Sequence, residues 1–354
     1  FPYTTLFRSS QLAGLTAANS PLLQLLVEVR DNTRFPDLSE STEQLAEAVG
    51  DAGGKLGAIG KVAAAAAGKA QGTLAKSLPD TAKKSMQRRF EPLHQLLDAN
   101  NGPAAELMPT LQALNDLQLQ VASLARSSQP EQAAYEMAKL RMSGQRDALN
   151  SLRGATSRLP RPISGWLDVL AEDTWMLVLD DTYQYLNQRY QTELHAFYSK
   201  ALHQRYPFNA HSTSDVAISD FREFFKAQGV ADRFFDTYMR PFVSGSAGNY
   251  RLRSIDGRSL PMSRLYLAQM GHVQVIRQSF FAQNSNEPQV QFKLEPYTLD
   301  PTVSRAEFRF GNQQMDYRHG PIVPMSFSWP TDAEDGRTSL VLEKMVGRPV
   351  GIEK

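Results

Sequence analysis

Residues 220–243 read DFREFFKAQGVADRFFDTYMRPFV, and this stretch decides the fold because the spacing of apolar residues changes at its end. Before it, apolar residues recur every three or four positions, as on one face of a helix. After it, they alternate with polar residues, as in a half-buried strand. We therefore predict an α+β chain, with an N-terminal helical bundle followed by an antiparallel β-sandwich-like domain that contains one inserted helix. The core joining the two parts is predicted to consist of Phe221, Phe225, Phe234, Phe235 and Tyr238.

The helical pattern covers residues 83–243, which we predict to form one bundle domain. Leucines between Leu107 and Leu124 form a single apolar stripe, and a longer helix is predicted to end at Pro207. Residues 10–82 are predicted to contain a short helix and then a flexible Ala/Gly-rich segment, since each glycine weakens a helix by roughly 1 kcal/mol relative to alanine.

The strand pattern covers residues 244–354. The inserted helix is predicted at about residues 263–283, between strands that are separated by Gly, Asn and Pro. The clearest alternating segments are 250–253, 290–294, 306–310, 315–317, 325–329 and 340–342.

Composition narrows the class of protein. The 354 residues include 38 basic and 37 acidic side chains, so the net charge of +1 gives no reason to expect nucleic acid as a partner. Cysteine is absent, which excludes disulfides and thiolate chemistry. Neither a transmembrane helix nor a signal peptide is evident. Residues 1–9 can be back-translated into a common sequencing-library adapter, so we interpret them as an artefact that contributes nothing to the fold.

Motifs for catalysis or cofactor binding are incomplete. The segment 57–62 resembles a phosphate-binding loop, but Lys55 replaces its first glycine and Val62 its final Ser or Thr. The six histidines form no His-Glu-x-x-His pair, and the carboxylate clusters lack the spacing of a calcium loop. We therefore predict no enzyme activity, cofactor or metal site.

Polar loops at strand ends are the better candidates for function, because such loops are free to carry recognition. The segment 331–337 is one of them, and residues 317–321 can also be read as a hairpin end whose side chains order the loop. The candidate partner-binding residues are Gly311, Asn312, Gln313, Gln314, Tyr317, Arg318 and His319.

An ordered series of aromatic and proline motifs resembles the C-terminal, periplasmic part of the IcmF-like family of type VI secretion, usually called TssM. The motifs that carry the resemblance are Tyr206-Pro207-Phe208, Arg240-Pro241-Phe242, Glu295-Pro296-Tyr297, Tyr317-Arg318-His319-Gly320-Pro321 and Trp329-Pro330. The resemblance implies a non-enzymatic scaffold of an inner-membrane protein. It also implies that the helical-plus-β part binds the outer-membrane lipoprotein TssJ and joins TssL and further copies in a multimeric envelope-spanning core.

Two differences from that family limit what the resemblance implies for this chain. The family's membrane helices and cytoplasmic part have no counterpart here, so membrane contact is expected only through segments outside this chain. Similar proteins also continue past residues 350–354, so we expect a truncated β-domain whose strand 339–345 lies at an unpaired edge. A cell-wall hydrolase and a generic helical adaptor of another envelope system remain alternative functions.

Overall fold

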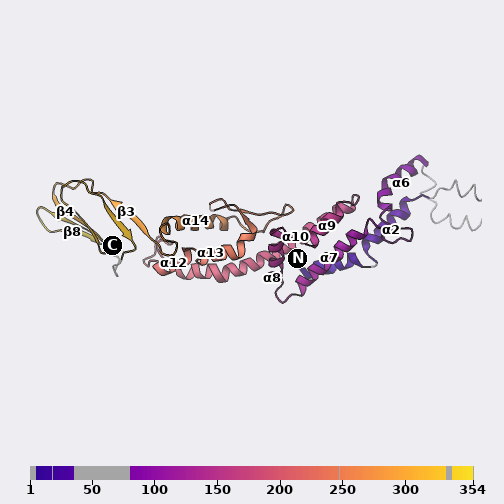
Figure 1. Ribbon diagram of the computed structural model, residues 1–354, viewed down its shortest axis with the longest axis horizontal. Helices are drawn as coiled ribbons and strands as arrows, with labels where there is room; N and C mark the ends of the chain where they lie inside the picture. Colours follow the sequence, from indigo (N-terminus) through magenta and orange to yellow (C-terminus); the bar gives the residue numbers. More distant parts are fainter. Residues whose placement is uncertain (1–4, 18, 36–79, 247, 332–336, 354) are drawn as a thin grey trace, which may run out of the picture. The chain divides into compact units, whose positions relative to one another are not determined.

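The computed structural model describes residues 5–17, 19–35, 80–246, 248–331 and 337–353, which form two compact units (Figure 1). The first unit ends at Asp181 and the second begins at Thr182. Most of the predicted Ala/Gly-rich segment, together with the incomplete phosphate-loop motif, lies outside the described residues.

Amphipathic helices build the first unit. The predicted leucine stripe lies on α7, where Leu114, Leu117 and Val121 are fully buried. Trp175 on α10 is also fully buried, and the guanidinium of Arg141 lies 5.0 Å from the centre of its ring. The helices are α1 (Thr5–Thr16), α2 (Pro21–Thr33), α6 (Asp80–His94), α7 (Met108–Arg126), α8 (Pro130–Met142), α9 (Ala148–Thr156) and α10 (Ile163–Arg189), the last of which continues into the second unit.

Part of the adapter-like segment belongs to the fold. Helix α1 begins at Thr5, the Arg8 guanidinium lies 3.6 Å from the Asp173 carboxylate, and Ser9 is buried. The prediction that residues 1–9 contribute nothing is therefore wrong for Arg8 and Ser9. The origin of the segment as a translated adapter stays a prediction.

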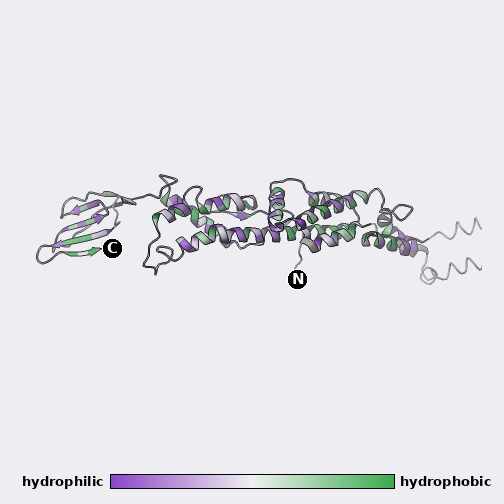
Figure 2. Cartoon of the chain, turned by 90° about the horizontal axis from the view of Figure 1, so that it is seen from below, coloured by the Kyte–Doolittle hydropathy of each residue, from purple (hydrophilic) through white to green (hydrophobic). Residues whose placement is uncertain are grey.

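The second unit begins with helices. Figure 2 shows hydrophobic and hydrophilic residues interspersed along the helices of both units, as amphipathic packing requires. A short hairpin, β1 (Val243–Ser244) with β2 (Arg251–Leu252), precedes the last helix. After α10 come η1 (Tyr190–His195), α11 (Ala196–Ala201), α12 (Ile218–Phe225), α13 (Val230–Phe234), η2 (Phe235–Met239), η3 (Arg240–Phe242) and α14 (Leu265–Phe280).

Helix α14 is the inserted helix of the sequence prediction, and it packs against other helices. The ring of Tyr266 on α14 meets Tyr190 on η1 and Phe234 on α13 edge-on, with ring centres 6.1 and 6.2 Å apart. These contacts join α14 to the helical part of the unit.

Two antiparallel sheets form the β-domain. Phe327 of the smaller sheet is fully buried, and its ring centre lies 5.5 Å from Phe292 in the same sheet and 5.3 Å from Phe308 in the larger sheet. The predicted α+β fold, with helices first and sheets second, is confirmed. The smaller sheet pairs β3 (Val290–Leu294) with β6 (Met325–Trp329), and the larger has the order β5 (Gln313–Tyr317), β4 (Val303–Phe310), β7 (Thr338–Lys344), β8 (Val350–Glu353).

The strand expected at an unpaired edge is paired on both sides. Strand β7 pairs with β4 through Leu340 and Phe308, and with β8 through Leu340 and Ile352. The prediction that residues 339–345 form an edge is therefore wrong, because it overlooked β8. In the described part of the larger sheet, β8 and β5 are the outer strands.

Candidate functional site

The strand register gathers three loops at one end of the β-domain, which we call the far end. Leu294 pairs with Met325, so β3 ends where β6 begins. Val303 pairs with Lys344, so β4 begins where β7 ends. The loops 295–302, 318–324 and 345–349 follow or precede these strand ends. The Met345 amide donates a hydrogen bond of 2.8 Å to the Thr302 carbonyl, which ties two of the loops together.

Large apolar side chains are exposed on all three loops, and we call them the apolar tip. Each loop contains proline, which restricts the backbone and so presents these side chains at a reduced cost in conformational entropy. Contiguous apolar groups exposed on a protein commonly mark interaction sites. The members and their exposed fractions are Tyr297 (83%), Ile322 (50%), Val323 (65%), Met345 (63%) and Val346 (89%).

Polar contacts order the loops of the far end. His319 has a φ of 47°, and its Nε2 lies 2.6 Å from the carbonyl oxygen of Val303. The Tyr317 hydroxyl donates to the Gly320 carbonyl at 3.1 Å. The Asp300 carboxylate accepts hydrogen bonds from the hydroxyl and the amide of Thr302, which hold the pKa of Asp300 below its usual value.

The candidates of the β4–β5 turn lie at the opposite end, because β4 separates the two ends by roughly 24 Å at 3.4 Å per residue. Gly311 has a φ of 56°, and its amide donates to the Arg337 carbonyl. The Gln313 side chain exchanges two hydrogen bonds of 2.8 Å with the backbone of Ser328, so it links the two sheets. Asn312 is exposed in the turn, and Gln314 donates to Asp316 at 3.1 Å.

The seven candidate residues therefore divide into two groups. Tyr317, Arg318 and His319 lie at the far end with the apolar tip, and residues 311–314 lie at the end next to the helical part. At that second end, Trp329 on β6 meets Phe280 of α14, with ring centres 5.8 Å apart. Sequence reasoning missed all five residues of the apolar tip. The signal that was available is apolar residues beside prolines within predicted loops.

The predicted junction residues also divide. Phe221 contacts Phe280 of α14, which in turn contacts Trp329 of β6, so Phe221 is linked to the β-domain through Phe280. The other residues pack mainly within the helical part. Phe225 stacks on Phe208, Phe234 meets Tyr190, Phe235 meets Tyr250, and Tyr238 meets Tyr185 and donates to Glu193.

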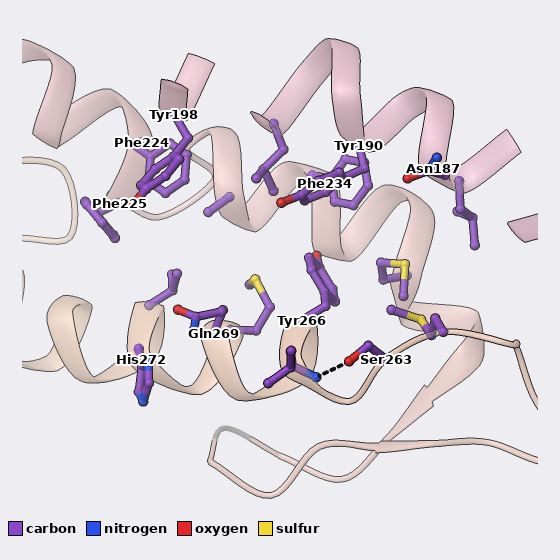
Figure 3. Close-up of a pocket in the computed structure, with 18 of the residues that line it drawn as sticks. Asn187, Tyr190, Tyr198, Phe224, Phe225, Phe234, Ser263, Tyr266, Gln269 and His272 are labelled. Atoms are coloured by element: carbon purple, nitrogen blue, oxygen red, sulfur yellow. Dashed lines mark hydrogen bonds between the residues drawn. The ribbon is translucent and has the colours of Figure 1, made fainter. Parts of the chain in front are cut away.

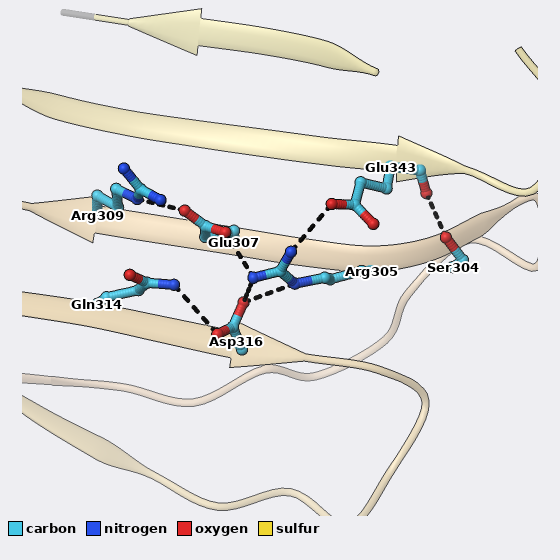
Figure 4. Close-up of polar contacts among 7 residues, drawn as sticks. All are labelled: Ser304, Arg305, Glu307, Arg309, Gln314, Asp316 and Glu343. Atoms are coloured by element: carbon cyan, nitrogen blue, oxygen red, sulfur yellow. Dashed lines mark hydrogen bonds and ion pairs between the residues drawn. The ribbon is translucent and has the colours of Figure 1, made fainter. Parts of the chain in front are cut away.

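The outer face of the larger sheet carries an ion-pair network (Figure 4). The Arg305 guanidinium contacts the carboxylates of Glu307, Asp316 and Glu343, and Arg309 contacts Glu307 from the other side. The hydrogen bond to Asp316 is the main cause that raises the pKa of Arg305. Because each carboxylate of the network is paired with an arginine and the pairs join three strands, the network is better suited to stabilising the sheet than to chemistry.

Among the residues that the structure describes, no group of three or more His, Asp or Glu side chains is placed to hold a metal ion. In the same residues, no single helix is both long and apolar enough to cross a membrane, although the bent pair Arg8–Thr16 and Pro21–Thr33 meets the criteria of length and composition.

Comparison with known proteins also divides the second unit into a helical part and a β-domain. Residues 181–286 match the type VI secretion protein IcmF helical domain, and residues 292–354 match the IcmF C2-like domain. The chain is 28% identical over 244 residues to the type VI secretion system component TssM1 of Pseudomonas aeruginosa, an alignment that covers 68% of this chain and 22% of that protein. The chain thus spans about a fifth of this relative's length.

Solved structures show the same fold. A chain of a structure described as the type VI secretion system membrane core complex has a TM-score of 0.62 and 20% identity, over 77% of this chain and 59% of its own length. A chain of a type VI membrane complex also has a TM-score of 0.62, with 19% identity over 77% of this chain and 56% of its own length. A helical domain joined to a C2-like β-sandwich defines the class of protein. The chain belongs to the IcmF/TssM family of type VI secretion proteins.

Proposed function

We propose that this chain is a structural, non-catalytic part of a type VI secretion membrane core complex, located in the periplasm. In this proposal, its β-domain binds the outer-membrane lipoprotein TssJ through the apolar tip and so links the inner membrane to the outer membrane. Family membership supports the role in the complex. The apolar tip is the observation that carries the assignment of the binding surface.

The far end has the size and character of a protein interface. Its three loops contain about 20 residues, and a standard interface uses about 20–30 residues on each side. Apolar and aromatic groups concentrate at the centre of interfaces, with polar groups at the rim. Arg318, Lys344 and Arg348 supply such polar groups among the apolar residues. The hydrogen bonds of His319 and Asp300 pre-order the loops, which reduces the entropy lost on binding.

The wider proposal includes association with TssL and with further copies of the protein in a multimeric core. Family membership is what supports this part of the proposal. We further propose that the chain needs no cofactor for this role, since a scaffold acts through binding alone.

The binding of TssJ can be tested with the full chain and an immobilised soluble form of the lipoprotein. Val323→Asp and Val346→Asp place a charge in the apolar tip, and each is expected to raise the Kd at least tenfold, about 1.4 kcal/mol. Val275→Asp is the matched control, because Val275 on α14 is also exposed, at 59%. It should change the Kd less than twofold.

A further variant separates the two ends of the β-domain. Asn312→Ala changes the exposed turn at the end next to the helices and should leave the Kd unchanged. If Asn312→Ala weakens binding while the valine variants do not, the lipoprotein binds at the wrong end for this proposal. Equal binding by all variants, with melting temperatures unchanged, would likewise refute the assignment to the apolar tip.

A further inference from the structure

A cavity of about 680 Å³ lies within the helical part of the second unit (Figure 3). Helix α14 forms one wall, and η1, α12 and α13 contribute to the opposite wall. Figure 3 shows Tyr266 and Gln269 on α14 facing Tyr190, Phe224 and Phe234 across the space. Ligand-binding pockets commonly have volumes of about 300–1,000 Å³, so this one can hold a ligand of ordinary size.

The pocket has an apolar floor and a polar rim. Phe225, Phe234, Met239 and Met270 are buried side chains of its lining. Its exposed lining residues are Asn187, Ser263, Leu265, Gln269 and His272, four of which are polar. Of the described lining residues, none is a lysine or arginine. Because a buried anion needs a cationic partner, this lining favours a neutral ligand.

Tyr266 provides a hydrogen-bond donor inside the pocket. Its ring stands edge-on between Tyr190 and Phe234, and its hydroxyl oxygen is buried without a hydrogen-bond partner among the described residues. Burial is the main cause that raises the pKa of Tyr266 well above its usual value, so the hydroxyl stays protonated. Buried polar groups are normally paired, and an unpaired one is costly. A ligand with an acceptor at this point would remove that cost.

The length of the pocket indicates the shape of the ligand. Tyr266 and Ile276 both line it and are ten residues apart on α14, which corresponds to about 15 Å at 1.5 Å per residue. The hydrocarbon core of a bilayer is about 30 Å thick, so the acyl chains of one leaflet extend about 15 Å. We propose that this pocket binds a single acyl chain, whose ester or amide carbonyl accepts a hydrogen bond from the Tyr266 hydroxyl.

Binding can be measured by calorimetry on the full chain, with 1-monopalmitoylglycerol as the neutral ester and palmitate as the free acid. The parent protein is expected to bind the ester more tightly than the acid, since the lining offers no lysine or arginine to the carboxylate. Tyr266→Phe keeps the ring and removes the donor, so it should weaken ester binding roughly three- to tenfold. Tyr206→Phe, the same change at an exposed tyrosine outside the pocket lining, should have no effect.

Melting temperatures separate this role from a purely structural one. Without ligand, Tyr266→Phe should melt at the same temperature as the parent or higher, because it deletes an unpaired buried hydroxyl. Ala231→Leu adds bulk at the pocket lining and should abolish ester binding while the protein remains folded.

Three results would overturn the proposal: no ester binding by the parent, equal ester affinity of the parent and Tyr266→Phe, or tighter binding of palmitate than of the ester. None of them bears on binding of the lipoprotein by the β-domain, so this inference and the proposed function fail independently.

Discussion

Replacing Gln313 by alanine tests whether this residue holds the two sheets together. Its side-chain amide donates to the Ser328 carbonyl, and its carbonyl oxygen accepts from the Ser328 amide, both at 2.8 Å. Each hydrogen bond contributes about 0.5–1.5 kcal/mol net, and the substitution also leaves two half-buried backbone groups of Ser328 unpaired. We therefore expect the β-domain to lose about 2–3 kcal/mol of stability.

Hydrogen exchange followed by mass spectrometry measures this loss where it occurs. Because 1.4 kcal/mol corresponds to a factor of ten, protection of the β6 peptide should fall roughly 30- to 140-fold. Gln314→Ala is the matched control, since Gln314 is exposed and its side chain donates only to Asp316 among the hydrogen bonds described. It should reduce protection less than threefold. Equal protection in both variants would show that Gln313 does not link the sheets and is free for recognition, as the sequence suggested.

Three further predictions concern the free energy of unfolding. Phe235→Ala should cost about 3–5 kcal/mol because its ring is buried, and a loss below about 1 kcal/mol in urea unfolding would contradict this packing. Gly311→Ala should cost about 1–3 kcal/mol, since φ is 56° and an added Cβ would overlap the Thr331 side chain. Gly320→Ala, with no such overlap, should be nearly neutral by thermal melting. Burial holds the pKa of His94 below its usual value of about 6.5, so the unfolded state binds protons first and stability should fall as the pH drops below about 7. His94→Gln should flatten that slope in urea titrations at pH 7.5, 6.5 and 5.5, and an unchanged slope would assign it to other groups.

The sequence by itself determined the element types and their order. Apolar residues at helical spacing can be buried together when they lie on one face of a helix. Leu114, Leu117 and Val121 are buried as that pattern requires. Alternation likewise located β3 to β7, because side chains on a strand point to opposite faces. The strand β8 was missed because it is short and contains glycine, which gives a weak pattern.

Only the tertiary structure decided which residues meet. Residues 311–314 and 317–319 are neighbours in sequence, yet β5 carries them to opposite ends of the sandwich, because a strand extends its chain by about 3.4 Å per residue. Conversely, the apolar residues near 297, 322 and 346 come to one end through pairing between distant strands. The environment of Tyr266 likewise depends on Tyr190 and Phe234, which reach it from helices far along the chain. Local patterns specify the helices and strands. Strand register and helix packing depend on contacts between residues far apart in the sequence, and these contacts form the apolar tip and the pocket.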